Sequence, residues 1–228
     1  MELLRKILKK FPDGILISLK KIYYFFLIQA GKFASSEKEF NLVRSIIPVG
    51  AKVIDIGANV GHYTLLFSEL VGKNGRVLAF EPIPKTFNML SSNPRFSKFE
   101  NITLINAAIS DVSMEVNFTI PAKNLYQSHM DSEGNVPVMC FPLEIFLPKN
   151  WEFCFLKIDA EGCDEEIIKN SIETLNTHRP IIMAELNSKK ANELIGIFSD
   201  YTVRGIKGSH NKFFVPNEKV DSFPLQEP

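Results

Sequence analysis

The amino-acid sequence predicts an α/β protein built on a mostly parallel sheet, and two features of the chain support that prediction. The β-branched run 53–56 is followed by a glycine turn at 57–61 and then by apolar residues at helical spacing, which indicates a strand, a tight turn and a helix. Further apolar strands at 76–81, 153–158 and 181–185 end in or beside a carboxylate. In open α/β sheets, ligands bind beyond the carboxyl ends of the strands, so these acids mark a candidate site.

The other expected elements complete an alternation of strands and helices. A capping box, with Ser36 as the N-cap and Glu39 three residues later, predicts a helix through Ile47 that Pro48 ends. Further along the chain we expect a helix at 85–91, strands at 102–105, 115–120 and 136–141, a helix at 189–198, and an antiparallel hairpin of 201–206 and 212–215. The strand at 153–158 is the most apolar, so we expect it at the centre of the sheet.

Composition and charge exclude several classes of protein. Hydrophobic residues make up 45% and charged residues 23% of the 228 residues, which is ordinary for a globular chain and argues against disorder. The formal net charge is zero, so a general affinity for nucleic acid is not indicated. The cysteines Cys140, Cys154 and Cys163 are odd in number and lack C-x-x-C spacing, which argues against a disulfide framework and a zinc site.

The first part of the chain differs from the rest in pattern. Within 1–11 the apolar residues form one helical stripe and the basic residues lie largely off it, so we expect a basic amphipathic helix, followed by a second helix over 15–30. Two lysines in the second helix leave too few uninterrupted apolar residues to cross a bilayer. We therefore divide the chain into an N-terminal helical extension at 1–35 and a main domain at 36–228.

Two kinds of contact are open to this extension. Residues 1–50 carry nine basic and four acidic residues, and such a segment can lie on a membrane surface. Helices that pack on the main domain or on a second copy of the chain have the same pattern, so a homo-oligomer contact through residues 1–30 stays open beside lipid contact. No small-residue cleavage site follows a clean apolar core. We expect a cytoplasmic protein, with the inner face of a membrane as the alternative location.

The glycine turn at 57–61 narrows the kind of ligand. A dinucleotide fingerprint is absent, because Asn59 stands where its second glycine belongs and His62 where its third belongs, and no phosphate-binding Gly-Lys-Ser/Thr loop is present. The next strand ends in Glu81, whose carboxylate can accept both hydroxyls of a ribose. A nucleoside without a pyrophosphate is therefore favoured, and S-adenosylmethionine fits that description.

Five segments resemble the FkbM-type methyltransferase family. They are VIDIGANVG at 53–61, VLAFEP at 77–82, NAAISD at 106–111, LKIDAEG at 156–162 and IIMAEL at 181–186, and they match the family in order and spacing between Ser36 and Pro216. The resemblance implies a class I methyltransferase (Rossmann-like) fold with helices on both faces of the sheet. It further implies S-adenosylmethionine as the methyl donor and, usually, a hydroxyl acceptor whose identity it does not give.

The resemblance and the residue pattern together assign a donor site. The expected contacts are Asp55, Gly57, Ala58, Asn59, Gly61, Glu81, Pro82, Ala107 and Ala108. We expect Glu81 to hold the ribose hydroxyls and the turn to meet the amino-acid part of the donor, with Asp55 supporting that turn or the donor's ammonium. Ala107 and Ala108 would leave room for an adenine face, although tight core packing explains such small residues equally well.

Catalysis is expected at the end of the central strand. Lys157, Asp159 and Glu161 alternate, so in extended chain they share one face, and Asp159 is a candidate base for the acceptor's hydroxyl proton, with Glu161 beside it. A purely structural role and a metal site formed by Asp159, Glu185 and Asn187 are the alternatives, and a metal requirement is left open. In the polar loop at 123–131, Ser128 and His129 are candidate acceptor contacts.

The sequence therefore predicts an S-adenosylmethionine-dependent O-methyltransferase acting on a hydroxyl acceptor. That acceptor would be a sugar, a glycan or a lipid-linked glycan. A non-catalytic S-adenosylmethionine-binding module on the same fold is the first alternative. An NAD(P)-dependent oxidoreductase is the second, and the missing fingerprint glycines argue against it.

Overall fold

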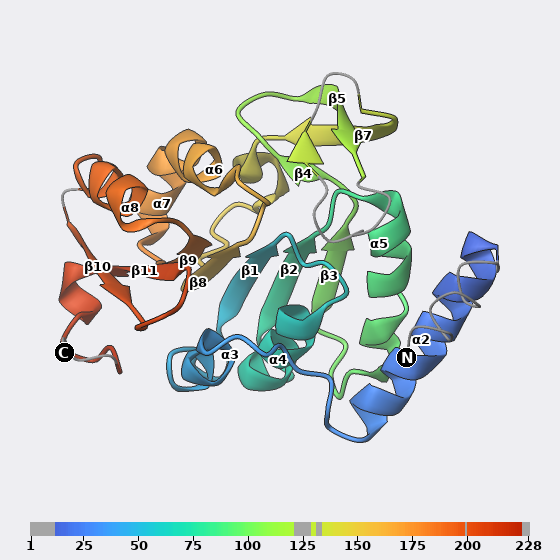
Figure 1. Cartoon of the computed structure of the whole chain (residues 1–228). Coiled ribbons are helices and arrows are strands. Elements are labelled where there is room, and N and C mark those ends of the chain that lie inside the picture. The colour runs from blue at the N-terminus through green and yellow to red at the C-terminus, as the bar shows by residue number, and fades with distance from the viewer. Residues whose placement is uncertain (1–11, 121–128, 131–133, 199, 225–228) are drawn as a thin grey trace.

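A seven-stranded sheet forms the centre of the computed structural model, which describes residues 12–120, 129–130, 134–198 and 200–224 (Figure 1). Its strands are β1 (Lys52–Ile56), β2 (Arg76–Phe80), β3 (Ile102–Ile105), β8 (Phe155–Ile158), β9 (Ile181–Glu185), β10 (Tyr201–Gly205) and β11 (Asn211–Pro216), in the order β10-β11-β9-β8-β1-β2-β3. Each neighbouring pair of strands is parallel along the order β9-β8-β1-β2-β3. In contrast, β11 pairs antiparallel with both β9 and β10. The predicted mostly parallel sheet with a C-terminal hairpin is confirmed, and β8 occupies its centre.

Successive residues of each strand point to opposite faces of the sheet and build two cores. On one face, Ile54 and Leu156 pack with apolar side chains of α6 (Asp164–Asn170), α7 (Ile172–His178) and α8 (Ser188–Ile195). On the other face, Val53 and Phe155 pack with side chains of α3 (Glu39–Leu42) and α4 (His62–Val71), while α5 (Pro84–Leu90) covers β2 and β3. Helices thus cover both faces, as the sequence predicts.

A small second sheet stands beside the carboxyl ends of the parallel strands (Figure 1). It consists of β4 (Ala108–Ile109), β5 (Met114–Thr119), β6 (His129–Met130) and β7 (Val136–Phe141), in the order β4-β7-β5-β6. Phe118 and Val138 of this sheet pack on Ile83, which follows β2. The turn of 3-10 helix η3 (Leu143–Phe146) then leads back toward β8.

Within the predicted N-terminal extension, the structure describes helix α2 (Asp13–Gln29), which lies against α5 and the 3-10 helix η2 (Asn93–Phe96) (Figure 1). The rings of Phe25 and Phe96 meet edge to face with centroids 4.7 Å apart. The expected basic helix at 1–11 lies outside the described residues. Within the described part of the chain, no helix combines the length and the apolar character needed to cross a membrane.

The predicted capping box at Ser36 is wrong. Helix α3 begins at Glu39 after Lys38 and has no side-chain cap, and its α-helical part ends at Leu42 before a turn of 3-10 helix, η1 (Val43–Ser45). A further short 3-10 helix, η4 (Asn217–Lys219), follows β11. Other hydrogen bonds hold the segment before α3. Ser35 Oγ accepts the Glu37 N–H at 3.2 Å, and the Glu37 carboxylate accepts the Tyr63 hydroxyl at 2.8 Å.

Candidate functional site

The glycine turn brings the ends of β1 and β8 into direct backbone contact. Gly57 has φ +74°, and a Cβ atom built there would overlap the carbonyl oxygen of Asp159. The N–H groups of Gly57 and Ala58 both donate to the Phe80 carbonyl, at 3.0 and 2.8 Å. Gly61, with φ +96°, then starts α4. Only glycine fits at position 57, because a side chain would push the two strand ends apart.

Beyond this turn lies a cavity of about 890 Å³, open solvent at its mouth included, which we call the strand-end cavity. Eight of the predicted site residues line it: Gly57, Asn59, Glu81, Pro82, Ala107, Ala108, Asp159 and Glu161. Its other walls are largely apolar, with Ile56, Phe80, Ile83 and Phe118 among them. The structure therefore brings most of the predicted donor contacts to one cavity at the carboxyl ends of β1, β2 and β8.

Glu81 is the buried acid of this cavity, with 5% of its surface exposed. Its two carboxylate oxygens accept the N–H groups of Asn59 and Ile83, both at 2.9 Å. Burial raises the pKa of this carboxyl to about 7, although the two hydrogen bonds act in the opposite direction. Each oxygen of a carboxylate has a second lone pair, so Glu81 keeps acceptor capacity toward the cavity. Asn59 also has an unpaired atom, because its buried side-chain oxygen has no hydrogen-bond partner among the described residues.

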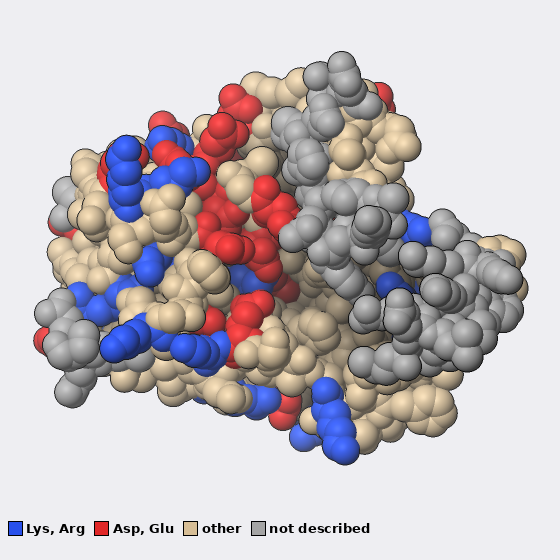
Figure 2. All heavy atoms as spheres, in the orientation of Figure 1, with Lys and Arg blue, Asp and Glu red and all other residues tan. Residues whose placement is uncertain are grey.

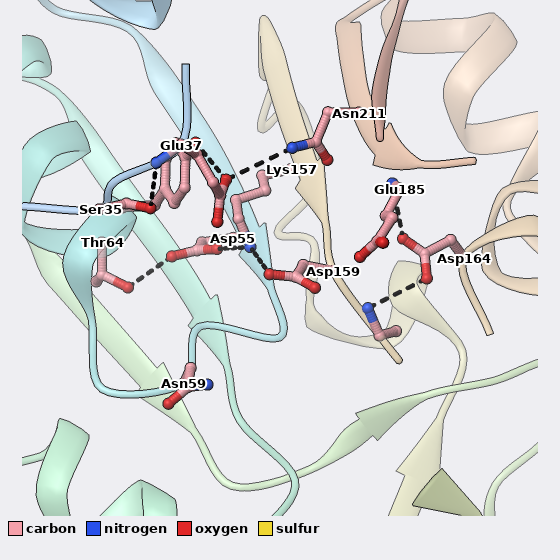
Figure 3. Close-up of polar contacts among 12 residues, drawn as sticks. Ser35, Glu37, Asp55, Asn59, Thr64, Lys157, Asp159, Asp164, Glu185 and Asn211 are labelled. Atoms are coloured by element: carbon pink, nitrogen blue, oxygen red, sulfur yellow. Dashed lines mark hydrogen bonds and ion pairs between the residues drawn. The ribbon is translucent and has the colours of Figure 1, made fainter. Parts of the chain in front are cut away.

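A buried ion-pair network lies next to the turn (Figure 3). The Lys157 ammonium lies 3.5 Å from Asp55 Oδ1 and 3.2 Å from Asp159 Oδ2, and Thr64 Oγ1 donates to Asp55 Oδ2 at 2.6 Å. Burial alone would lower the pKa of Lys157, but the carboxylates of Asp159, Asp55 and others together raise it above its ordinary value. Asp55 is fully buried and lines none of the cavities described here, so it supports the turn rather than facing a ligand.

The segment after β8 is fixed by a buried acid, Asp164, at the start of α6. Asp164 is 1% exposed, and its carboxylate accepts the N–H groups of Ala160 at 3.3 Å and Glu185 at 3.1 Å, which ties the ends of β8 and β9 together (Figure 3). Glu161, between Ala160 and Asp164 in the sequence, adopts φ +49°. Burial, together with the charges of Asp159, Glu185 and Asp164, raises the pKa of Glu161 to about 7. A carboxylate at a helix start is the only sequence signal for this role of Asp164, since its partner on β9, Glu185, is 21 residues away.

Two polar hollows adjoin the strand-end cavity, and Asp159 lines all three. The turn hollow, of about 680 Å³, is lined by Ser35, Glu37, Gly57, Ala58, Asn59, Val60, His62, Tyr63, Lys157 and Asp159. The acidic hollow, of about 800 Å³, is lined by Ser36, Glu37, Lys38, Glu39, Asp159, Glu185, Gly208, Ser209, His210 and Asn211. Figure 2 shows acidic side chains gathered at the middle of the face that carries these openings.

The remaining predicted residues divide into three groups. Gly61 starts α4 and lines none of these hollows. In the alternative metal set, Glu185 lines the acidic hollow, but the Asn187 side-chain oxygen accepts the Lys190 N–H at 2.9 Å as the N-cap of α8. Among the described residues, no group of three or more His, Cys, Asp or Glu is arranged to hold a metal ion. Ser128 lies outside the described residues, and of His129 only the strand pairing with Thr119 is described.

Comparison with known proteins identifies the family. The model of the Methyltransferase FkbM domain matches residues 55–204. In the solved structures, the methyltransferase FkbM of Methylobacillus flagellatus has a similar fold, with a TM-score of 0.54 and 18% identity over 72% of this chain and 43% of that chain.

Curated relatives match shorter stretches. The protein-L-isoaspartate O-methyltransferase of Methanococcoides burtonii is 24% identical over 133 residues, which is 45% of this chain and 66% of that protein. The enzyme of the same name from Methanothrix thermoacetophila is 32% identical over 56 residues, 25% of this chain and 27% of that protein. The chain thus spans less than two thirds of the length of the curated relatives it matches. Because the family model covers more than half of the sequence, the chain belongs to the FkbM methyltransferase domain family.

Proposed function

We propose that this chain transfers a methyl group from S-adenosylmethionine to a hydroxyl of an acceptor such as a sugar, a glycan or a lipid-linked glycan. The observation that carries the proposal is the position of Asp159. This residue lines the strand-end cavity, whose walls suit an adenosyl group, and also the acidic hollow, which is open to a polar acceptor. A base at the boundary between the two spaces can serve a transfer from one to the other.

The residues present fit the donor. Glu81 is a buried acceptor for a pair of ribose hydroxyls, and Ala107 and Ala108 leave space beside it for a flat base. The unpartnered side-chain oxygen of Asn59 offers a further acceptor where the strand-end cavity meets the turn hollow. Gly57 keeps the backbone close enough for contact with a ligand, so the turn hollow can take the amino-acid end of the donor.

The donor supplies a methyl group already activated on a positively charged sulfur, so the protein mainly positions the acceptor and removes a proton. Lys157 holds Asp159 through a 3.2 Å ion pair, while 35% of the Asp159 side chain stays exposed. When the acceptor oxygen bonds to the methyl carbon and the sulfur–carbon bond breaks, Asp159 takes the hydroxyl proton. Glu161 lies beside it with a pKa raised to about 7 and can exchange that proton with solvent.

Two measurements test this function. Titration of S-adenosylmethionine and of NAD by calorimetry separates a methyl-donor site from a nicotinamide site. Labelled S-adenosylmethionine, incubated with fractions of a cell extract, then tests transfer. We expect Asp159→Asn to lower turnover by about a hundredfold or more while donor affinity changes by less than about threefold. Donor binding without label transfer to any fraction would favour the non-catalytic module.

A metal-assisted reaction through Asp159 and Glu185 is the competing mechanism. Exhaustive chelation separates the two, because a protein base needs no cation. Activity that survives chelation supports Asp159 as the base. Activity that is lost and then restored by Mg²⁺ would favour the metal-assisted reaction.

A further inference from the structure

The acidic hollow has its own set of charged residues, separate from the donor contacts. It lies between the segment 36–39 and the hairpin turn 208–211 that precedes β11. Glu39 and Glu185 line it, and neither of them lines the strand-end cavity or the turn hollow. Glu37 and Asp159 line both polar hollows and form the wall between them. A ligand in the acidic hollow would therefore contact side chains that the donor leaves free.

Glu39 is the unusual residue of this hollow. It is 1% exposed, and its Oε1 atom has no hydrogen-bond partner among the described residues. Burying an unpaired polar atom costs free energy, and the cost is larger for a charged group. Because Glu39 also lines the acidic hollow, a hydrogen-bond donor of a ligand bound there is a candidate partner for this buried oxygen.

The charges around the acidic hollow favour a ligand with a positively charged group that donates hydrogen bonds. The Glu37 carboxylate, which accepts the Tyr63 hydroxyl at 2.8 Å and the Asn211 side-chain amide at 3.5 Å, faces Lys157 and Asp159 (Figure 3). Burial and the nearby carboxylates of Asp159 and Asp164 raise the pKa of Glu185, although His210 acts in the opposite direction.

Cations on the protein only partly balance these acids. The Lys38 ammonium donates to the Lys207 carbonyl at 2.8 Å, on the hairpin side of the hollow. Lys157 is already shared between Asp55 and Asp159. Glu37, Glu39, Asp159 and Glu185 therefore leave the hollow with an excess of negative charge, and a bound cation would reduce it.

We propose that the acidic hollow binds the methyl acceptor through a protonated amino group, so that the substrate is an amino alcohol, such as an amino sugar. This inference rests on the proposed function. In this arrangement Glu39 and Glu185 bind the ammonium, and a hydroxyl of the same molecule reaches Asp159 on the shared wall. An ammonium is a compact donor of three hydrogen bonds, which suits a group of carboxylates around one small space.

Ligand-detected NMR on the full chain, saturated with S-adenosylhomocysteine, tests the inference without requiring methyl transfer. The probes are glucosamine and ethanolamine, with N-acetylglucosamine as the neutral counterpart at the same ionic strength. We expect saturation transfer to glucosamine or ethanolamine and none to N-acetylglucosamine. Glu39→Gln keeps the shape of the side chain and removes its charge, and it should weaken amine binding by about ten- to a hundredfold. Glu185→Gln provides a second variant, and Glu173→Gln, an exposed residue of α7, is the charge-matched control.

Each result decides the question. Equal signals from glucosamine and N-acetylglucosamine, no signal from either amine, or a signal that survives both Glu39→Gln and Glu185→Gln would overturn the inference. Calorimetry with S-adenosylmethionine separates this from a failure of the proposed function. The Glu39→Gln protein should bind that donor within about threefold of the unmodified chain, whereas a tenfold loss would reassign Glu39 to the donor and also overturn the inference.

Discussion

The strand-end cavity and the acidic hollow share Asp159, yet they are built in different ways. In the cavity the buried acid Glu81 is satisfied by two backbone N–H groups, and the turn contacts the Asp159 backbone directly. In the hollow the acids are side chains from segments far apart in sequence, and Glu39 keeps an unpartnered oxygen. The donor side is therefore fixed by main-chain geometry. The acidic hollow, to which we assign the acceptor, is formed instead by side chains from separate segments of the chain.

Lys157 pairs with Asp55 and with Asp159, the residue that both spaces share, so its loss should have the largest effect. Lys157→Met leaves Asp55 buried without its cation, and we expect a loss of about 3–5 kcal/mol in the free energy of unfolding, measured by urea denaturation. Lys169→Met is the control, because Lys169 forms an exposed pair with Glu165 at 2.6 Å, and its loss should leave the unfolding midpoint unchanged. Similar small effects for both variants would show that the buried network does not support the turn.

Gly57→Ala tests the main-chain contact between the two strand ends. We expect a loss of about 2–4 kcal/mol in stability together with loss of donor binding, because the new methyl group overlaps the Asp159 carbonyl and the residue must also keep φ +74°. Gly162→Ala is the matched control: it has φ +101° but open space around its Cβ, so it reports the conformational penalty alone. Equal losses in the two variants would remove the steric argument.

The segments around Gly57 and Lys157 also show what could be predicted from the sequence. The strand, the glycine turn and the helix from residue 52 to residue 71 are local, and their pattern of apolar residues and glycines predicts them directly. The same holds for β8 and for the hairpin of β10 and β11. Glu81 and Asp159 could be assigned to the site because each stands at or just beyond the end of such a strand.

Contacts between distant side chains could not be predicted in this way. Asp164 binds the Glu185 N–H, and the Tyr63 hydroxyl reaches Glu37, 26 residues away. The Ser36 capping box failed for the same reason, since Glu37 binds the Tyr63 hydroxyl and Lys38 binds the Lys207 carbonyl, and no cap forms before α3. The acidic hollow also depends on such contacts, so of its acids only Asp159 and Glu185, which stand at or beside strand ends, could be singled out from the sequence.

Glu81→Ala tests the side chain that we assign to the donor ribose. Loss of a charge-assisted contact to two hydroxyls should weaken S-adenosylmethionine binding by about ten- to a hundredfold, measured by calorimetry. Glu115→Ala, on the exposed side of β5, should leave affinity unchanged. A folded Glu81→Ala protein that binds the donor normally would rule out the ribose assignment.

A smaller effect should appear in the pH dependence of donor binding. Burial raises the Glu81 pKa from 4.5 to about 7, so near neutral pH a fraction of the free protein carries a neutral carboxyl. The ionised form accepts hydroxyl hydrogen bonds better, and donor affinity should therefore rise by a fewfold between about pH 6 and pH 8.

The same shift affects stability with the opposite sign. The folded state binds the Glu81 proton more tightly than the unfolded state does, so this group lowers the free energy of unfolding as pH rises through the window between 4.5 and about 7. Glu81→Gln should flatten both profiles, and Glu161→Gln serves as the control because its pKa is raised to a similar value. If Glu161→Gln flattens the binding profile and Glu81→Gln does not, then the group whose titration changes donor affinity is Glu161, beside Asp159, and not Glu81.

The smallest effect on donor binding is expected at α2, which lies away from both spaces. Its outer side exposes 53% of Ile22, 58% of Tyr23 and 63% of Phe26, an apolar surface suited to a lipid bilayer or a second copy of the chain. In the full chain, Ile22→Ser combined with Phe26→Ser should leave donor affinity unchanged and stability within about 0.5 kcal/mol, because neither side chain contributes to the core clusters.

The same variant should reduce pelleting with anionic phosphatidylglycerol vesicles if α2 binds lipid, or lower the mass measured by light scattering if α2 joins two copies. If neither property changes, both interpretations of the N-terminal extension fail, and the role of α2 is limited to packing through Tyr24 and Phe25 on its inner side.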